Sequence, residues 1–339
     1  MKYKESGIIN QLIDESKDIV IVQADNPDAD SLGSALALEA ILDEQSKNIS
    51  LYCPVDMPDY IKYLSGWDRV NYRLPDQFDT VIFVDVSSFT LLEKSKSNGD
   101  LNRLLSKKVI VIDHHANVAN TIDDAKAFIN DGSASSAGEV IFNISSDNKW
   151  AIPIDAIDPI MSAILGDTQG LTNSLATADT YKIMASLIEL GGNRSLLEER
   201  RREYSKMPEQ IFKYKADLIK RTEFITNSQI AYVVVNQNEI NKYSPLYNPA
   251  PLIQNDMLQT VGVKLAIVFK TYDDRRITAA LRSSQDTPIA GKIAEQQGGG
   301  GHDMASGFKK TNIDDFDKVI KETLELANHE LEEFKNENI

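Results

Sequence analysis

The first half of the chain alternates short apolar runs, rich in β-branched residues, with segments of helical spacing. Such runs are typical of buried strands, and they lie at 19–22, 49–53, 80–84, 109–112 and 127–129. Helical spacing follows at 8–16, 35–42, 137–144, 154–165 and 181–190. This alternation predicts an α/β fold with a doubly wound, mainly parallel sheet.

The second half of the chain has a different pattern. Residues 196–225 are charged and mostly helical in spacing, without a strand-like run. Strand patterns return at 231–235, 264–270 and 275–284. Helices are expected after them, at 290–295 and 314–334. We therefore predict a first domain over 1–193, a helical linker over 194–226 and a smaller α/β domain over 227–339.

The charge of the chain limits its partners. The 339 residues include 36 Lys and Arg against 51 Asp and Glu, which gives a net charge of −15. Binding of a long duplex depends on neutralising many phosphates, so we expect any nucleic-acid substrate to be short. The single cysteine, Cys53, fits a reducing compartment, and no stretch reads as a signal peptide or a membrane span. We expect a cytoplasmic protein with no membrane partner.

Five aspartates lie at the ends of the apolar elements, namely Asp28, Asp30, Asp85, Asp113 and Asp167. The carboxyl ends of parallel strands meet at one edge of a sheet, where ligand sites form. Carboxylates gathered there repel each other unless a cation neutralises them. Asp28 and Asp30 are equally compatible with a helix amino-terminal cap, because Asp is favoured there.

Two imidazoles follow the fourth strand directly, in the stretch Val109–Val118. His114 and His115 come after Asp113, so one carboxylate and two rings leave the sheet together. Oxygen ligands with one or two imidazoles favour Mn²⁺ or Mg²⁺ over structural Zn²⁺. Two ions about 3.5–4 Å apart, with water attacking phosphorus, are the arrangement that phosphoryl-transfer hydrolases use.

A serine-rich loop precedes the helix expected at 137–144. Its hydroxyl groups come from Ser133, Ser135 and Ser136, and Glu139 follows Ser136 by three residues. This spacing predicts a capping box.

A second polar segment contains the glycines Gly298 to Gly301, among them Gly299 and Gly300, followed by His302. Backbone N–H groups without a Cβ nearby can hold a phosphate, although a glycine run is equally compatible with a flexible loop. The small residues at 304–307 are interpreted as the start of a helix. Arg282, on the strand predicted before this segment, could supply a bidentate phosphate contact.

Six motifs in this order carry a resemblance to a known family: NPDADSLGS, FVDVSS, IDHHANV, SASSAGE, GDTQG and GGGGHDMASGF. The chain resembles the DHH phosphoesterase superfamily with its DHH-associated carboxy-terminal domain. Its size is similar to that of the NrnA-like group, which are nanoRNases and phosphoadenosine phosphate phosphatases. The resemblance covers nearly the whole chain, and it makes 1–193 the catalytic domain and 227–339 the substrate-binding domain.

The resemblance implies a two-ion Mn²⁺ centre. Asp28 would belong to the first ion, and Asp85 would bridge the two ions. Asp30, His114 and Asp167 would complete the second ion.

The resemblance also implies roles around the metals. His115 would face the scissile phosphate, and Asp113 would orient its neighbours. Arg282 and the segment Gly299, Gly300, Gly301 and His302 would hold the other end of the substrate.

One position departs from the family pattern. The family usually has a histidine four residues before the first loop aspartate, where this chain has Ala24. Alanine cannot coordinate a metal, so we expect the first ion to bind more weakly. Gln23, Asp25 or Asn26 could substitute, and the sequence leaves that open.

The sequence therefore predicts a two-metal phosphoesterase that acts on short oligoribonucleotides or 3′-phosphoadenosine 5′-phosphate. Two alternatives stay open: a phosphodiesterase for cyclic or linear dinucleotides, and a degenerate nucleotide-binding homologue with low activity. Inorganic pyrophosphatase is disfavoured, because that family lacks the glycine-rich segment. The sequence also leaves a homodimer open.

Overall fold

The protein is described by a computed structural model that covers residues 2–115, 121–244 and 247–337, without the side chain of His302. The end of the stretch Val109–Val118 therefore lies outside the described residues. The chain divides into two compact units, Met1–Lys206 and Met207–Ile339. The boundary falls inside the segment expected as a linker: helix α8 (Arg194–Tyr204) belongs to the first unit and α9 (Glu209–Arg221) to the second.

The first unit contains a parallel five-stranded sheet in the order β2-β1-β3-β4-β5, which confirms the predicted fold class. Its strands are β1 (Asp18–Val22), β2 (Asn48–Tyr52), β3 (Thr80–Val84), β4 (Lys108–Asp113) and β5 (Ala127–Asn130). Val84 pairs with Ile112 across β3 and β4. The residues that follow these two strands therefore emerge side by side at one edge of the sheet.

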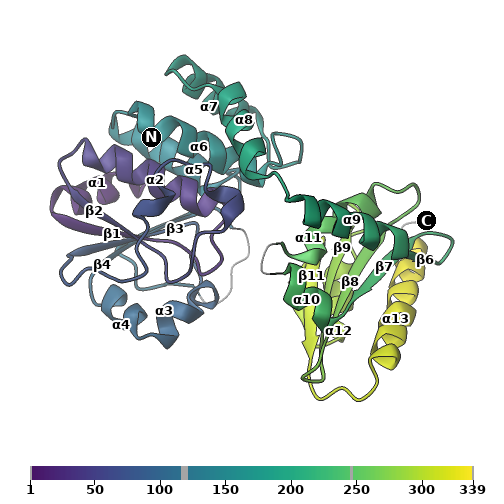
Figure 1. Cartoon of the computed structure of the whole chain (residues 1–339). Coiled ribbons are helices and arrows are strands. Elements are labelled where there is room, and N and C mark those ends of the chain that lie inside the picture. The colour runs from purple at the N-terminus through teal and green to yellow at the C-terminus, as the bar shows by residue number, and fades with distance from the viewer. Residues whose placement is uncertain (1, 116–120, 245–246, 338–339) are drawn as a thin grey trace. The chain divides into compact units, whose positions relative to one another are not determined.

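Helices cover both faces of this sheet (Figure 1). The helices of this unit, besides α8, are α1 (Ser6–Asp14), α2 (Ala29–Asp43), α3 (Glu93–Ser97), α4 (Asp100–Leu105), α5 (Ala137–Asn148), α6 (Ile154–Asp167) and α7 (Ala178–Glu189), of which α7 packs on α5 and α6. Side chains of a strand alternate between faces. Ile21 accordingly packs in the cluster of α2, α5 and α6, whereas Val22 packs with α4 on the other face.

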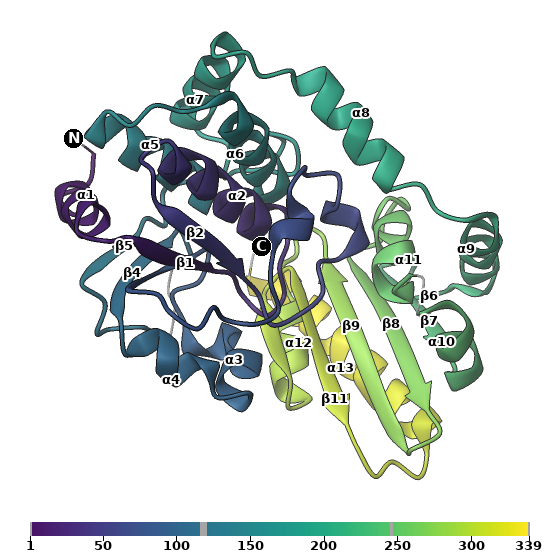
Figure 2. The same cartoon turned by 60° about the vertical axis from the view of Figure 1, so that its left-hand side comes forward.

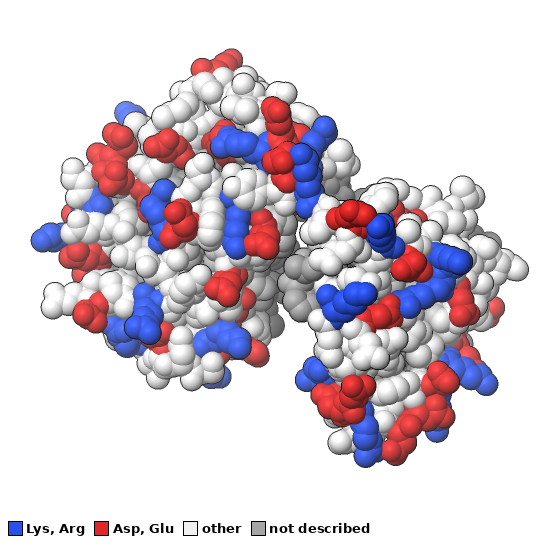
Figure 3. Space-filling view, in the orientation of Figure 1, with Lys and Arg blue, Asp and Glu red and all other residues white. Residues whose placement is uncertain are grey.

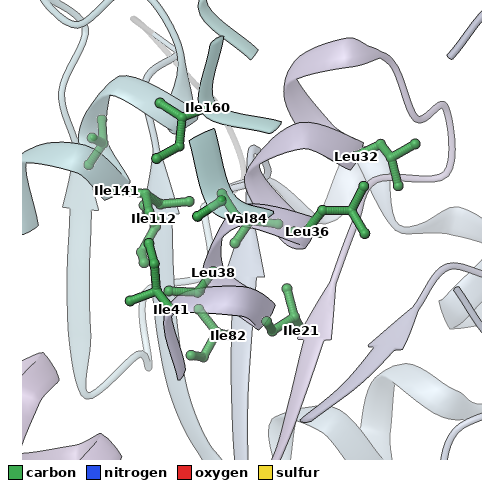
Figure 4. Close-up of a cluster of buried hydrophobic side chains, with 14 of the residues drawn as sticks. Ile21, Leu32, Leu36, Leu38, Ile41, Ile82, Val84, Ile112, Ile141 and Ile160 are labelled. Carbon is green, nitrogen blue, oxygen red and sulfur yellow. The ribbon is translucent and has the colours of Figure 1, made fainter. Parts of the chain in front are cut away.

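The larger cluster is the main core of the first unit. Figure 4 shows strand residues Ile21, Ile82 and Ile112 near the helix residues Leu36 and Ile141. Full burial of one such side chain contributes about 1.5–3 kcal/mol. This packing holds α2, α5 and α6 on one face of the sheet.

Helix α2 begins earlier than predicted. It starts at Ala29 rather than near Ala35, because the Asp28 carboxylate caps it. Asp28 Oδ1 accepts hydrogen bonds from the backbone N–H groups of Asp30 and Ser31, each at 3.0 Å. The cap interpretation is therefore confirmed for Asp28, and Asp30 lies in the first helical turn and not in a loop.

The second unit contains a mixed six-stranded sheet in the order β10-β11-β9-β8-β7-β6. Its strands are β6 (Glu223–Ile225), β7 (Ile230–Val235), β8 (Leu265–Tyr272), β9 (Arg276–Ser283), β10 (Gly300–His302) and β11 (Ala305–Lys310). Helices α12 (Ala290–Gln296) and α13 (Phe316–Glu337) pack on one face (Figure 2). Helices α9 and α11 (Pro249–Leu258) pack on the other, and α10 is Gln237–Tyr243.

Two secondary-structure predictions for this unit are wrong. Residues 223–225 form strand β6 by pairing with β7. The helix start expected at 304–307 is instead the beginning of β11, which pairs with β9 and β10. Small residues allow this close pairing: a Cβ on Gly299 would lie 2.1 Å from the carbonyl oxygen of Gly307.

Among the residues that the structure describes, no helix is both long enough and apolar enough to span a bilayer.

Gly33 tests the packing of α2 against α6. A Cβ at Gly33 would lie 2.5 Å from the carbonyl oxygen of Pro159, whereas a Cβ at Gly7 meets nothing within 4 Å. We expect Gly33→Ala to lower the free energy of unfolding of the first unit by about 1–3 kcal/mol through overpacking. Gly7→Ala should raise it by up to about 1 kcal/mol through helix propensity. Urea unfolding of both variants checks this, and equal stability of the two would contradict the close contact.

Candidate metal centre

The Asp30 carboxylate is fully buried at the start of α2. Its Oδ1 accepts hydrogen bonds from Ser34 Oγ at 2.8 Å and from the Gly138 N–H at 3.1 Å. Its Oδ2 accepts one from the Ala137 N–H at 2.7 Å. Ala137 and Gly138 open helix α5, and a helix amino terminus favours a negative charge. Asp30 therefore joins α2 to α5.

Glycines let the three helices approach closely at this point. A Cβ on Gly138 would lie 2.5 Å from the Cβ of Ala163, and one on Gly166 would lie 2.9 Å from the Cβ of Ala29. With Gly33, these contacts bring the start of α2 against the last turns of α6, which ends at Asp167.

Three carboxylates surround one ring nitrogen of His114. Nε2 lies 3.0 Å from Asp167 Oδ2, 3.3 Å from Asp30 Oδ2 and 3.6 Å from Asp85 Oδ1. The ring is 7% exposed. Thus β3, β4, α2 and α6 each deliver one side chain to a common point, as the strand and helix ends predicted.

Asp113 holds the backbone of His114 and the imidazole of His115 in place. Its Oδ1 accepts the backbone N–H of His114 at 2.7 Å and pairs with His115 Nδ1 at 2.8 Å. His115 Nδ1 also lies 3.6 Å from Asp85 Oδ1. The ring of His115 is 39% exposed, so it faces the entrance of the site while His114 is buried.

Asp85 adopts a left-handed backbone with φ +58°. This conformation is uncommon for a residue with a side chain, although Asp tolerates it better than most, and such residues cluster at functional sites. Its N–H donates to the carbonyl of Ile112 at 2.9 Å, which ties the turn to β4. Among the described atoms, the buried Asp85 Oδ1 has no hydrogen-bond partner.

The pKa values of these groups are strongly shifted. Burial, followed by the Asp167 charge, raises the pKa of Asp30 to about 7. Burial and the Asp30 charge raise the pKa of Asp85 well above its usual range, and burial raises that of Asp28. Each raised pKa results from a carboxylate that is held away from water and close to other carboxylates.

The pKa values of the two imidazoles and of Asp113 shift in the direction opposite to the effect of burial. Burial opposes ionisation of His114, but the Asp167 and Asp30 carboxylates raise its pKa to about 9. The hydrogen bond to Asp113 raises the pKa of His115. Burial alone would raise the pKa of Asp113, yet the bond from His115 holds it below its usual value.

The donor set fits a divalent cation. Two groups of three potential ligands lie together: Asp30, His114 and Asp167, and Asp85, His114 and His115. Carboxylate oxygens with an imidazole nitrogen suit a hard divalent ion, and a cation would satisfy the orphaned Asp85 Oδ1. The four residues expected around the second ion, Asp30, Asp85, His114 and Asp167, are therefore together.

The residues expected around the first ion are less complete. Asp28 uses Oδ1 as the α2 cap. Ala24 is 4% exposed in the apolar cluster on the opposite face of the sheet. Asp25 accepts the Lys94 N–H, and Asn26 is exposed. Among the described residues, Asp28 belongs to neither group of potential ligands at this centre, and the buried Gln23 amide has no hydrogen-bond partner.

The predicted substrate-gripping residues lie in the second unit. Ala305 of β11 pairs with Arg282 of β9 on one side and with His302 of β10 on the other. Arg282 is exposed, while the side chain of His302 lies outside the described residues. Gly300 and Gly301 are part of β10, and Gly299 directly precedes it. The structure thus brings Arg282 and His302 to one register of the sheet.

The serine-rich loop supports the site differently from the prediction. Ser136 Oγ accepts the Glu139 N–H at 3.0 Å, which is half of a capping box. The Glu139 carboxylate does not return to Ser136. Its Oε2 accepts from Ser135 Oγ at 2.7 Å and Thr180 Oγ1 at 2.8 Å. Glu139 thereby ties the loop to α7, a contact that sequence spacing could not reveal.

Comparisons with known proteins agree with this architecture. Residues 18–164 match the family model described as DHH family, N-terminal domain, and residues 248–330 match the one described as DHHA1 domain. The bifunctional oligoribonuclease and PAP phosphatase NrnA of Bacillus subtilis is 23% identical over 89% of this chain and 92% of its own length.

Two further proteins extend the comparison. The cyclic-di-AMP phosphodiesterase GdpP of Bacillus subtilis is 21% identical over 97% of this chain, which spans 50% of that protein. The crystal structure of an exopolyphosphatase-related protein from Bacteroides fragilis matches with a TM-score of 0.82 and 20% identity, over 98% of this chain and 96% of that one. At this identity the likeness is one of fold.

Asp30 tests the cation site. Asp30→Asn keeps the shape but removes a charge, so we expect Mn²⁺ affinity to fall by roughly a hundredfold or more, because loss of even an outer metal partner costs about 10–100-fold. Asp179→Asn, on the exposed surface of α7, is the matched control and should bind Mn²⁺ as the native chain does. Calorimetric titration of the metal-free protein measures both. Equal affinity of the two variants would exclude Asp30 as a ligand.

Proposed function

Because the chain belongs to the DHH family, we propose that it is a metal-dependent phosphoesterase that hydrolyses short oligoribonucleotides or 3′-phosphoadenosine 5′-phosphate. The observation that carries the proposal is the convergence of Asp30, Asp85 and Asp167 on His114 Nε2. The relative named NrnA, which aligns over most of both chains, supports this substrate class.

The chemistry follows from the charges at the site. A bound divalent cation supplies the positive charge that neutralises the carboxylates, polarises a phosphoryl oxygen and activates water as the nucleophile. Mn²⁺ is our choice of ion, with Mg²⁺ as the alternative. In the proposal, Asp30, Asp85, His114 and Asp167 hold the second ion, and Asp28 and Asp85 hold the first.

His115 is proposed to contact the scissile phosphate. Asp113 Oδ1 pairs with Nδ1 of the ring, which leaves Nε2 to point toward the substrate. The same hydrogen bond stabilises the protonated imidazole, so His115 can donate to a phosphoryl oxygen. In the second unit, Arg282 and the segment Gly299–His302 are proposed to bind the other end of the substrate through guanidinium and backbone N–H donors.

A second candidate activity is hydrolysis of cyclic or linear dinucleotides. The likeness to GdpP over 97% of this chain favours it, because the same metal chemistry serves a cyclic phosphodiester. Rates on a cyclic dinucleotide, its linear product and an RNA dinucleotide, measured side by side, distinguish the two activities.

Asp85→Ala tests the enzymatic proposal. With Mn²⁺ present, the native chain should release mononucleotides from RNA of two to five residues. Asp85→Ala should lower the rate by roughly a hundredfold or more, since loss of even an outer metal partner costs about 10–100-fold. Asp179→Ala should keep the native rate, because that side chain is on the exposed surface of α7. Unchanged activity in Asp85→Ala would refute the proposal.

Ala24→His tests whether the first ion is weakened. The first ion is expected to bind more weakly, so in a titration it is the second equivalent of Mn²⁺ to bind. The new imidazole should raise its affinity by about 10–100-fold. Ala24→Leu has a side chain of similar bulk without a ligand atom and should not raise it. Calorimetric titration gives the stoichiometry of both variants, and thermal unfolding checks that the buried position tolerates them. Two tightly bound ions in the native chain would contradict a weakened first site.

A further inference from the structure

A pocket of about 550 Å³ opens in the first unit between α2, the 3₁₀ turn Asp59–Ile61, the end of α6 and helix α8. We call it the α8 pocket, lined among others by Ala29, Tyr60, Tyr63, Gln169, Arg194 and Arg201. Its volume lies in the range of small-molecule sites. The described metal ligands do not line it, but their chain neighbours do.

The α8 pocket adjoins the metal centre through those neighbours. Ala29 lies between Asp28 and Asp30 in the chain, and Gln169 follows Asp167 by two residues. The Tyr60 hydroxyl donates to the carbonyl of Pro27 at 3.5 Å, which places this ring beside the same loop. The α8 pocket and the metal centre are thus built on the same two segments, the start of α2 and the end of α6.

One side of the pocket carries excess positive charge. Glu198 accepts both Nε and Nη2 of Arg201 at 2.8 Å, Nε of Arg202 at 2.8 Å and Nη1 of Arg194 at 3.4 Å. Of these arginines, Arg194 and Arg201 line the pocket, so its lining holds two guanidinium groups and one carboxylate, and the side chain of Arg201 is still 49% exposed. Figure 3 shows blue side chains around red ones over the α8 region. This local charge contrasts with the net −15 of the chain.

The lining of the pocket is also aromatic and apolar. Tyr63 is 6% exposed, and Tyr60 is 53% exposed. Ile61, Leu165 and, on α8 itself, Leu197 add apolar surface. Aromatic rings stack on nucleobases with little preference for sequence, and guanidinium groups bind phosphates through paired donors.

We propose that the α8 pocket binds one nucleoside monophosphate unit, with its phosphate on Arg194 and Arg201 and its base against Tyr60. The inference rests on the proposed function, because it assigns the unit beside the scissile phosphate to this pocket. Apolar walls without arginines would suit a neutral ligand, and arginines without an aromatic wall would suit inorganic phosphate. The combination selects a nucleotide.

Adenosine 5′-monophosphate is the probe, titrated by calorimetry into the full chain with Mg²⁺ present. The double variant Arg194→Gln/Arg201→Gln should weaken binding about tenfold or more, as loss of charge-assisted hydrogen bonds of about 1.5–3 kcal/mol implies. Arg202→Gln is the matched control, because Arg202 shares Glu198 but is not among the described lining residues of the α8 pocket. It should change the affinity less than about twofold. Tyr60→Leu should weaken adenosine monophosphate but not inorganic phosphate.

The outcomes separate this inference from the proposed function. Native affinity in the double variant, an equal loss in Arg202→Gln, or equal affinity for inorganic phosphate and adenosine monophosphate would each overturn the pocket assignment. If the native chain hydrolyses no RNA dinucleotide yet the titrations follow the expectation, the pocket stands and the proposed function fails. Thermal unfolding of each variant confirms that its fold is retained.

Discussion

The burial of the Asp30 carboxylate is the constraint on which the first unit depends. A buried anion without partners would be costly, and here Ser34 Oγ and the N–H groups of Ala137 and Gly138 all donate to it. These donors come from α2 and from the amino terminus of α5, so satisfying one charge fixes the two helices relative to each other. The close approach of Gly33 in α2 to α6, and of Gly166 in α6 to Ala29 in α2, then brings Asp167 to the same place.

The same constraint explains why a divalent cation would fit this site. Hydrogen bonds from α5 stabilise Asp30, but they do not reach Asp85, whose Oδ1 has no partner among the described atoms. The imidazole of His114 is the only ring that lies within 3.6 Å of the three carboxylates in the described chain. One imidazolium cannot balance three carboxylates, so the remaining negative charge is what a divalent ion would neutralise.

Much of the first unit could be predicted from the sequence, because its strands are apolar runs and its site residues sit where those runs end. Asp85 and Asp113 follow this rule directly. The sequence could not decide whether Asp30 lies in a loop or at the start of a helix, since Asp is favoured in both places. Residues 304–307 were predicted wrongly, because small residues permit either a helix start or a strand, and pairing with β9 decided. The role of Glu139 depends on Thr180, which is distant in sequence.

In the proposal, Ala24 weakens the first ion without disturbing the fold. The position lies in an apolar cluster with Val22 and Val86, so alanine is as compatible with the packing as any small residue. Nothing in the sheet requires an imidazole there, whereas Asp30 and His114 each satisfy several partners at once. Substitution at a position that serves only the first ion leaves the second group of ligands intact. In this proposal Asp28, which caps α2, and Asp30 serve both the fold and the ions, whereas position 24 would serve the first ion alone.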